Sequence, residues 1–179
     1  PFKNRLFGIV VEEDFSGTNR TFIRYSDTDN YESWSALNEM SITDTLIGLC
    51  SLREDMLLAF SKTKVYRVIP SGTTFEWIKI GDRGAASARL MTNTLEAIWW
   101  VDDEGLYKFD GASISIIGPS LEVLSYVRGL ISGNGIMGSF SKGQKLFIGG
   151  TYKGNNCFLI LDLFLQTIVL RFTENKIIS

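Results

Sequence analysis

Two clusters of acidic residues are the places where this sequence could support chemistry. The first occupies one short segment and contains Asp27, Asp29, Asn30 and Glu32. Its spacing resembles the first half of a calcium-binding loop, in which carboxylate and amide oxygens surround the ion. Such a loop also has a glycine at its sixth position and a glutamate at its twelfth, and this sequence has neither there. A solvated loop shaped by side-chain-to-backbone hydrogen bonds explains the same residues, so we predict no metal site.

The second cluster, Asp102-Asp103-Glu104, lies at the tip of a predicted β-hairpin. Two carboxylates can cleave a glycosidic bond when a groove holds the sugar between them and one of them has a raised pKa. A solvated turn is the simpler interpretation, and the sequence favours it. A carbohydrate-binding or glycoside-cleaving protein stays open as an alternative. Its sugar-stacking faces and carboxylates would come from Trp34, Trp77, Trp99, Trp100, Asp102, Asp103 and Asp110.

Other catalytic patterns find little support. The sequence contains no histidine, which excludes Ser-His-Asp and Cys-His catalysis and histidine-ligated zinc. Segments 61–64 and 139–142 satisfy the pattern Ser-x-x-Lys. In acyl-transferring enzymes that pattern begins a helix, whereas both copies here fall at predicted strand ends, where positions i and i+3 point to opposite faces. We therefore predict a protein that is not an enzyme, with no catalytic residue and no cofactor.

The composition is that of a globular, β-rich protein. Of the 179 residues, 45% are hydrophobic and 21% are charged, and the net charge is −2, which indicates no strong attraction to nucleic acid. Aromatic residues make up 12%, and 17 glycines accompany only 3 prolines, a balance that favours strands and turns. Cys50 and Cys157 both lie in apolar contexts, which predicts free buried thiols.

Two features of the sequence concern the extent of the chain and its relation to membranes. It begins at Pro1, which suggests a fragment of a longer chain. Its most apolar run, residues 157–172, is interrupted by Asp162, Gln166 and Arg171. A membrane-spanning helix needs about 20 consecutive apolar residues, so we predict no membrane span.

The elements that must position the acidic clusters are hairpins. The clearest runs from Glu96 to Gly111: Ile98–Val101 is an apolar strand, Asp102–Gly105 is a turn, and Leu106–Phe109 returns. Similar units recur along the chain. The predicted strands are 5–13, 21–25, 45–50, 55–61, 64–70, 74–80, 98–101, 106–109, 114–117, 136–140, 145–149, 157–161 and 168–172, with a short helix at 120–131 and a loop at 151–156.

The return strands indicate a repeat. Phe22, Val65, Leu106 and Phe158 open equivalent strands, about 40 to 45 residues apart except for a longer last interval. Four short strands in each such period are typical of β-propeller blades. We predict an all-β, β-propeller-like array of about four antiparallel blades with one short helix, as a single domain over residues 1–179, complete or part of a larger ring. A β-sandwich with irregular spacing is the alternative.

Several segments in order resemble a known family. They are Asn4-Arg5-Leu6-Phe7, Tyr25-Ser26 followed by Trp34, Ile47-Gly48-Leu49, Met56–Phe60, Val65–Val68, Gly84–Leu90, Asp103–Gly111 and Ser120–Leu124. Over about residues 4 to 125 the chain resembles the β-propeller nozzle or hub proteins in the tails of short-tailed bacteriophages. Gly-Leu-Tyr-Lys-Phe-Asp-Gly, residues 105–111, is the most specific piece, although similar motifs occur in unrelated propellers.

The resemblance implies a structural role in the virion tail. Such a protein binds other tail and adaptor proteins, assembles with copies of itself around the DNA exit channel, and contacts DNA only transiently during ejection. Repeat scaffolds that bind peptides are a further alternative. The predicted contact loops are 12–19, 26–34 and 151–156, with the turn at 102–103. Their candidate contact residues are Asp14, Asn19, Asp27, Asp29, Trp34, Asp102, Asp103, Tyr152 and Asn155.

Overall fold

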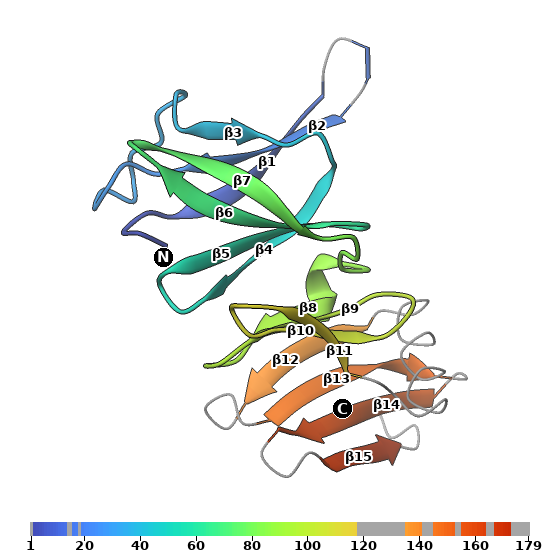
Figure 1. Cartoon of the computed structure of the whole chain (residues 1–179). Helices are drawn as coiled ribbons and strands as arrows, with labels where there is room; N and C mark the ends of the chain where they lie inside the picture. The colour runs from blue at the N-terminus through green and yellow to red at the C-terminus, as the bar shows by residue number, and fades with distance from the viewer. Residues whose placement is uncertain are drawn as a thin grey trace. The chain divides into compact units, whose positions relative to one another are not determined.

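The computed structural model describes residues 2–13, 16–17, 19–117, 135–140, 145–152, 155–163 and 167–172. This part of the chain consists of β-strands, their connections and one short 3-10 helix. The strands form four antiparallel sheets (Figure 1). The predicted all-β class is therefore confirmed.

The chain divides into two compact units, and the first covers Pro1–Ala85. It holds a three-stranded and a four-stranded sheet, and in both each strand pairs with the next one along the chain. The first sheet contains β1 (Phe7–Glu13), β2 (Asn19–Tyr25) and β3 (Glu39–Ser41). The second contains β4 (Leu46–Leu52), β5 (Met56–Ser61), β6 (Val65–Ser71) and β7 (Thr74–Gly81).

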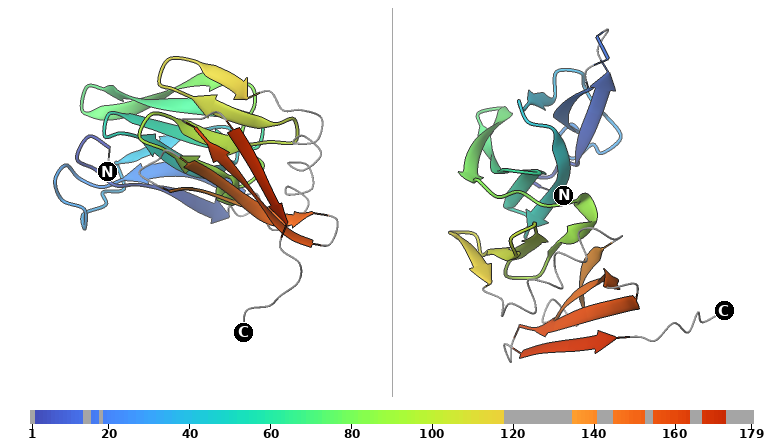
Figure 2. Two further views of the ribbon diagram at one scale, coloured as in Figure 1. Left: turned by 90° about the horizontal axis from the view of Figure 1, so that it is seen from below. Right: turned by 90° about the vertical axis from the view of Figure 1, so that its right-hand side faces the viewer.

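The second unit covers Ala86–Ser179 and holds two four-stranded sheets with the same meander order. The first of them follows the 3-10 helix η1 (Ala88–Leu90) and contains β8 (Met91–Asn93), β9 (Ile98–Val101), β10 (Leu106–Phe109) and β11 (Ile114–Ile117). The other contains β12 (Ile136–Phe140), β13 (Lys145–Tyr152), β14 (Asn155–Asp162) and β15 (Thr167–Phe172). Figure 2 shows these last four strands, in orange and red, lying side by side.

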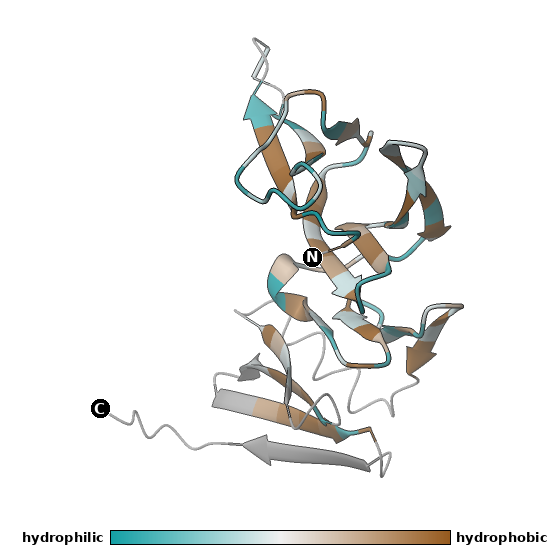
Figure 3. Cartoon of the chain, turned by 90° about the vertical axis from the view of Figure 1, so that its left-hand side faces the viewer, coloured by the Kyte–Doolittle hydropathy of each residue, from teal (hydrophilic) through white to brown (hydrophobic). Residues whose placement is uncertain are grey.

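The core of the first unit lies between its two sheets. Leu57 and Ala59 of β5 pack in one cluster with Ile23 and Tyr25 of β2. Side chains alternate across a strand, so Leu58 and Phe60 point to the opposite face of β5, and they are fully buried as well. Strand β5 is therefore buried on both faces, which explains its apolar run Met56–Phe60. Figure 3 shows hydrophobic residues, in brown, on strands throughout the described part of the chain.

The core of the second unit is built in the same way. Trp99 and Val101 of β9 pack with Leu146 and Ile148 of β13. On the opposite face of β9, Trp100 is fully buried and stacks on Tyr107 of β10, with ring centroids 5.5 Å apart and an interplanar angle of 11°.

Four hairpin turns are closed by one shared device. In each turn, the side-chain oxygen of the first residue accepts hydrogen bonds from the backbone N–H groups two and three positions later. The N–H of that first residue donates to the carbonyl oxygen of the fourth. An oxygen one or two bonds beyond Cβ is needed, which is why Ser, Thr and Asp recur there. The turns are Ser61–Lys64, Thr94–Ala97, Asp102–Gly105 and Asp110–Ser113.

Predictions about elements need correction in two places. Strands β3 and β8 were not expected, and each is only three residues long. The predicted loop at 151–156 is largely strand, because β13 and β14 continue into it and pair Thr151 with Asn156 and Tyr152 with Asn155. Threonine and tyrosine favour strands, which accounts for the extension. The predicted helix at 120–131 lies outside the described residues, and the single domain and the propeller arrangement stay predictions.

Candidate contact surface

The loop at residues 26–38 is organised by the carboxylate of Asp27. One carboxylate oxygen accepts a hydrogen bond from the Ser33 hydroxyl at 2.5 Å, and the other accepts one from the Asn38 side-chain amide at 2.6 Å. The backbone N–H of Asp27 donates to Ser33 O at 2.8 Å. Hydrogen bonds from Ser33 and then Asn38 lower the pKa of Asp27. Both oxygens are thus engaged within the loop, which favours the structured-loop interpretation over calcium.

The same loop is fastened to the start of the chain. Ser26 donates its N–H to Leu6 O at 2.9 Å, and its hydroxyl accepts the N–H of Leu6 at 3.0 Å. The Arg5 guanidinium donates to Ser26 O at 2.7 Å, and the Asp29 N–H donates to Asn4 O at 3.0 Å. Asp29 has a φ of 56°, a left-handed conformation that aspartate tolerates better than most residues. These bonds hold the loop in one conformation.

This fastened loop presents large apolar side chains to solvent. Leu37 is 89% exposed, Tyr31 43% and Trp34 40%. The Trp34 indole donates to Tyr31 O at 3.0 Å, and its ring edge lies near Gly8 of β1. Exposed aromatic and aliphatic side chains on a rigid loop are typical of protein contact sites. We name the set Tyr31, Trp34 and Leu37 the apolar loop patch.

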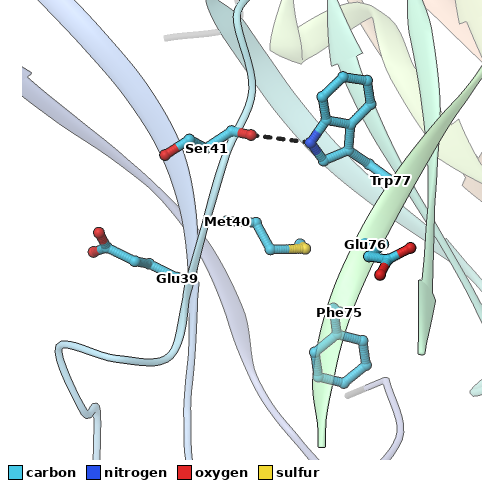
Figure 4. Close-up of a pocket in the computed structure, with 6 residues that line it drawn as sticks. All are labelled: Glu39, Met40, Ser41, Phe75, Glu76 and Trp77. Atoms are coloured by element: carbon cyan, nitrogen blue, oxygen red, sulfur yellow. Dashed lines mark hydrogen bonds between the residues drawn. The ribbon is translucent and has the colours of Figure 1, made fainter. Parts of the chain in front are cut away.

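A second surface feature lies between the outer strands of the two sheets of this unit. It is an open hollow of about 330 Å³ between β3 and β7. Figure 4 shows Met40 pointing from β3 toward β7, and the Trp77 indole donating to Ser41 O at 2.9 Å. We name this hollow the edge groove; its lining residues are Glu39, Met40, Ser41, Phe75, Glu76 and Trp77.

Three titratable groups of the first unit, Asp44, Lys64 and Tyr66, interact with one another. The Tyr66 hydroxyl donates to one oxygen of Asp44 at 2.5 Å, and Lys64 Nζ lies 2.9 Å from the same carboxylate. The hydrogen bond from Tyr66, and then that from Lys64, lowers the pKa of Asp44. Burial, followed by the hydrogen bond to Asp44, raises the pKa of Tyr66 to about 12. Each group has a partner, and together they tie the segment after β3 to β6.

The acidic tip at 102–104 is a turn. Asp102 is only 4% exposed, and one of its oxygens accepts the N–H groups of Glu104 at 2.8 Å and Gly105 at 3.0 Å. Burial raises the pKa of Asp102, and these backbone hydrogen bonds oppose that rise. Asp103 is exposed at the tip. Of the residues offered for sugar binding, Trp99 and Trp100 are buried, and Asp110 closes its own turn, whereas Trp34 and Asp103 are exposed.

The remaining candidate contact residues lie at hairpin ends. Asn19 is exposed, begins β2 and pairs with Glu13. Tyr152 and Asn155 pair through their backbones, and their side chains, like all of Asp14, lie outside the described residues. Within the described ranges, no group of three or more His, Cys, Asp or Glu residues could hold a metal ion. No helix there is long and apolar enough to cross a membrane.

Comparisons with known proteins bear on the fold alone. No family model and no curated protein matches the sequence. The chain is similar to the crystal structure of a "Putative exported protein" from Bacteroides fragilis, with a TM-score of 0.50 and 13% sequence identity. The match covers 95% of this chain and 55% of that chain, so this chain spans about half the length of the protein it matches. At this identity the likeness shows the fold alone.

Sequence reasoning missed Leu37 and the edge groove. Leu37 lies three residues beyond the predicted contact loop 26–34. The signal for β3 was present in Glu39-Met40-Ser41-Ile42, which alternates polar and apolar residues. Four residues are too few for that alternation to stand out from a loop.

Proposed function

We propose that this chain is a non-enzymatic assembly module of a bacteriophage tail, of the nozzle or hub kind. Its task is to bind neighbouring tail and adaptor proteins, and further copies of itself, around the channel through which DNA leaves. A channel lined by a protein without strong positive charge suits transient DNA passage, because ion pairs between Lys or Arg side chains and the DNA phosphates would hold the DNA in place. The tail assignment rests on the sequence resemblance.

The observation that carries the assembly role is the apolar loop patch on a fixed loop. Leu37, at 89% exposure, is more open to water than any other large hydrophobic residue in the described part of the chain. The hydrogen bonds of Asp27 and Ser26 order this loop in advance. A partner that covers the patch gains apolar burial and loses little loop entropy, which favours association.

The use of the carboxylates also supports a non-enzymatic role. Asp27, Asp102 and Asp110 each accept hydrogen bonds within their own loop or turn. Their oxygens position backbone and neighbouring side chains, so these groups act in the fold rather than on a substrate.

Immunogold electron microscopy of purified phage particles tests the tail assignment. We expect antibodies against this chain to label one end of the particle, at the tail. Purified particles that lack the chain by both labelling and mass spectrometry would contradict the assignment.

Paired variants test the patch. Leu37→Ser should greatly reduce incorporation into particles while thermal unfolding of the isolated chain stays nearly unchanged, because this side chain is 89% exposed. Leu95→Ser is the matched control, since Leu95 is an exposed leucine at 69% in the turn between β8 and β9. Equal loss of incorporation in both variants would remove the patch from the proposal.

A further inference from the structure

The outer edge of β3 has backbone groups directed away from its sheet. Tyr25 donates its N–H to Asn38 O at 3.0 Å, and Ile23 lies opposite Met40. Antiparallel bonding alternates along a strand, so positions 38 and 40 bond to β2, whereas 39 and 41 direct their N–H and C=O groups outward. The Trp77 indole, which bonds to Ser41 O from β7, agrees with that direction. No described strand pairs with this edge.

We propose that this edge, with the edge groove beside it, binds an extended basic segment of a partner protein as an added β-strand. Main-chain hydrogen bonds to the N–H and C=O of Glu39 and to the N–H of Ser41 would hold the segment, since Ser41 O already accepts the Trp77 indole. Alternate side chains would provide specificity. This inference deepens the proposed assembly function and rests on it, because it specifies how one partner is bound.

The two faces beside the edge differ in character. Met40 is 6% exposed and packs in the core cluster that also contains Phe75. The neighbouring Glu39 points to the other face, toward solvent (Figure 4). A strand added beside β3 would place every second side chain next to Met40 and Phe75, and the others next to Glu39. Apolar residues suit the first set.

Charge identifies the occupant as basic. The six lining residues include two carboxylates, Glu39 and Glu76, and no cation. One oxygen of Glu76 accepts a hydrogen bond from the Ser71 hydroxyl at 2.5 Å. Glu39 forms an ion pair with Arg24 at 3.2 Å, but its side chain is 41% exposed, so it can accept a second cation from an added strand. Opposite charges directly across a strand pair are favourable, and like charges are unfavourable. A lysine or arginine beside Glu39 therefore fits, whereas a second acidic residue does not.

The probe is a fluorescein-labelled peptide of about nine residues in which Lys and Val alternate. We expect it to bind the full chain measurably by fluorescence anisotropy, at least tenfold more tightly than a matched Glu-Val peptide. Two isomers of the Lys-Val peptide, N-methylated on alternate sets of backbone amides, should differ in binding. The isomer that keeps the amides facing β3 should bind, and the isomer that blocks them should not, because each lost bond weakens binding about fivefold.

Protein variants locate the site. Ser41→Pro removes an outward N–H without removing a bond to β2, a position where edge strands tolerate proline, and it should reduce Lys-Val binding at least fivefold. Glu39→Gln with Glu76→Gln should weaken binding and flatten its salt dependence. Glu54→Gln is the matched control, because Glu54 is an exposed carboxylate outside the groove, and it should change nothing.

The outcomes separate this inference from the tail assignment. Lys-Val binding that survives the blocking N-methylation or Ser41→Pro would overturn strand addition at β3, as would a lack of binding by the peptide. The proposal would also be overturned if the chain self-associates and Ser41→Pro abolishes this self-association, since the occupant would then be a second copy. All of these results leave the immunogold test of the tail assignment unaffected, and absence from particles leaves the peptide result unaffected.

Discussion

The turns Ser61–Lys64 and Asp102–Gly105 occupy the same place in two sheets and share one hydrogen-bond pattern. Each joins the second and third strands of a four-stranded sheet, and the side chain of its first residue is almost completely buried, at 3% exposure for Ser61 and 4% for Asp102. Only the capping group differs: a neutral hydroxyl in one and a carboxylate in the other. The comparison teaches that the turn requires an oxygen acceptor near Cβ, and that the charge of Asp102 is incidental to it.

The largest difference between the turns lies in what packs against them. A Cβ placed on Gly84 would lie 1.9 Å from Ser61 O and 2.7 Å from the carbonyl carbon of Lys62. These are backbone atoms that cannot turn aside. Gly84→Ala should therefore displace the first turn and lower the free energy of unfolding by about 3 kcal/mol, measured by urea denaturation.

Gly138→Ala is the control for that substitution. No described atom lies within 4 Å of the position its Cβ would take, and glycine in a strand interior is itself unfavourable. Its free energy of unfolding should stay within about 0.5 kcal/mol of that of the original chain or rise slightly. A Gly84→Ala protein as stable as Gly138→Ala would contradict the close approach.

Removal of the acceptor from either turn should have the next largest effect. Asp102→Ala leaves the buried N–H of Gly105 and the partly buried N–H of Glu104 without their acceptor, and Ser61→Ala does the same to the partly buried N–H groups of Thr63 and Lys64. Each change should cost about 2 kcal/mol in urea denaturation. Asp102→Ser restores an acceptor without the charge and should recover part of the loss. No recovery would mean that the carboxylate itself matters and that the two turns are not equivalent.

The pH dependence of stability should distinguish the turns. Because the pKa of Asp102 is raised in the folded chain, its ionisation opposes folding. The associated stability is complete below the usual aspartate pKa of 3.8 and is lost as the pH rises through the higher folded pKa. The stability of the original chain minus that of Asp102→Asn should therefore fall as the pH rises above the usual aspartate pKa of 3.8. The same difference for Ser61→Ala should stay flat across this range, and a rise for Asp102 would contradict the burial argument.

The turns were predictable from sequence, but the roles of their side chains were not. Asp-Asp-Glu-Gly and Asp-Gly between apolar runs predicted hairpins at 102–105 and 110–111, and the structure has them. Three consecutive acidic residues do not reveal which of them turns inward. That choice depends on which residue starts the turn, since Asp102 Oδ1 turns inward to accept the N–H groups of Glu104 and Gly105.

The candidate surfaces were harder to foresee, for different physical reasons. The loop at 26–34 was predicted as a contact loop, yet its rigidity depends on bonds to Asn4 and Leu6, which are distant in sequence. The edge groove forms only because the packing of two sheets brings β3 close to β7. Local sequence patterns do not predict that approach.

The smallest expected effect concerns the second residue of each turn. Lys62 and Asp103 are both exposed, but only Asp103 lies beside a buried carboxyl, and its negative charge contributes to the raised pKa of Asp102. Asp103→Asn should therefore lower the pKa of Asp102 in a carboxyl-carbon NMR titration and stabilise the chain at neutral pH by a few tenths of a kcal/mol. Lys62→Ala, the matched change in the neutral turn, should leave stability within about 0.5 kcal/mol. If Asp103→Asn leaves the Asp102 titration unmoved, the acid groups of this tip do not interact, and burial alone accounts for the difference between the two turns.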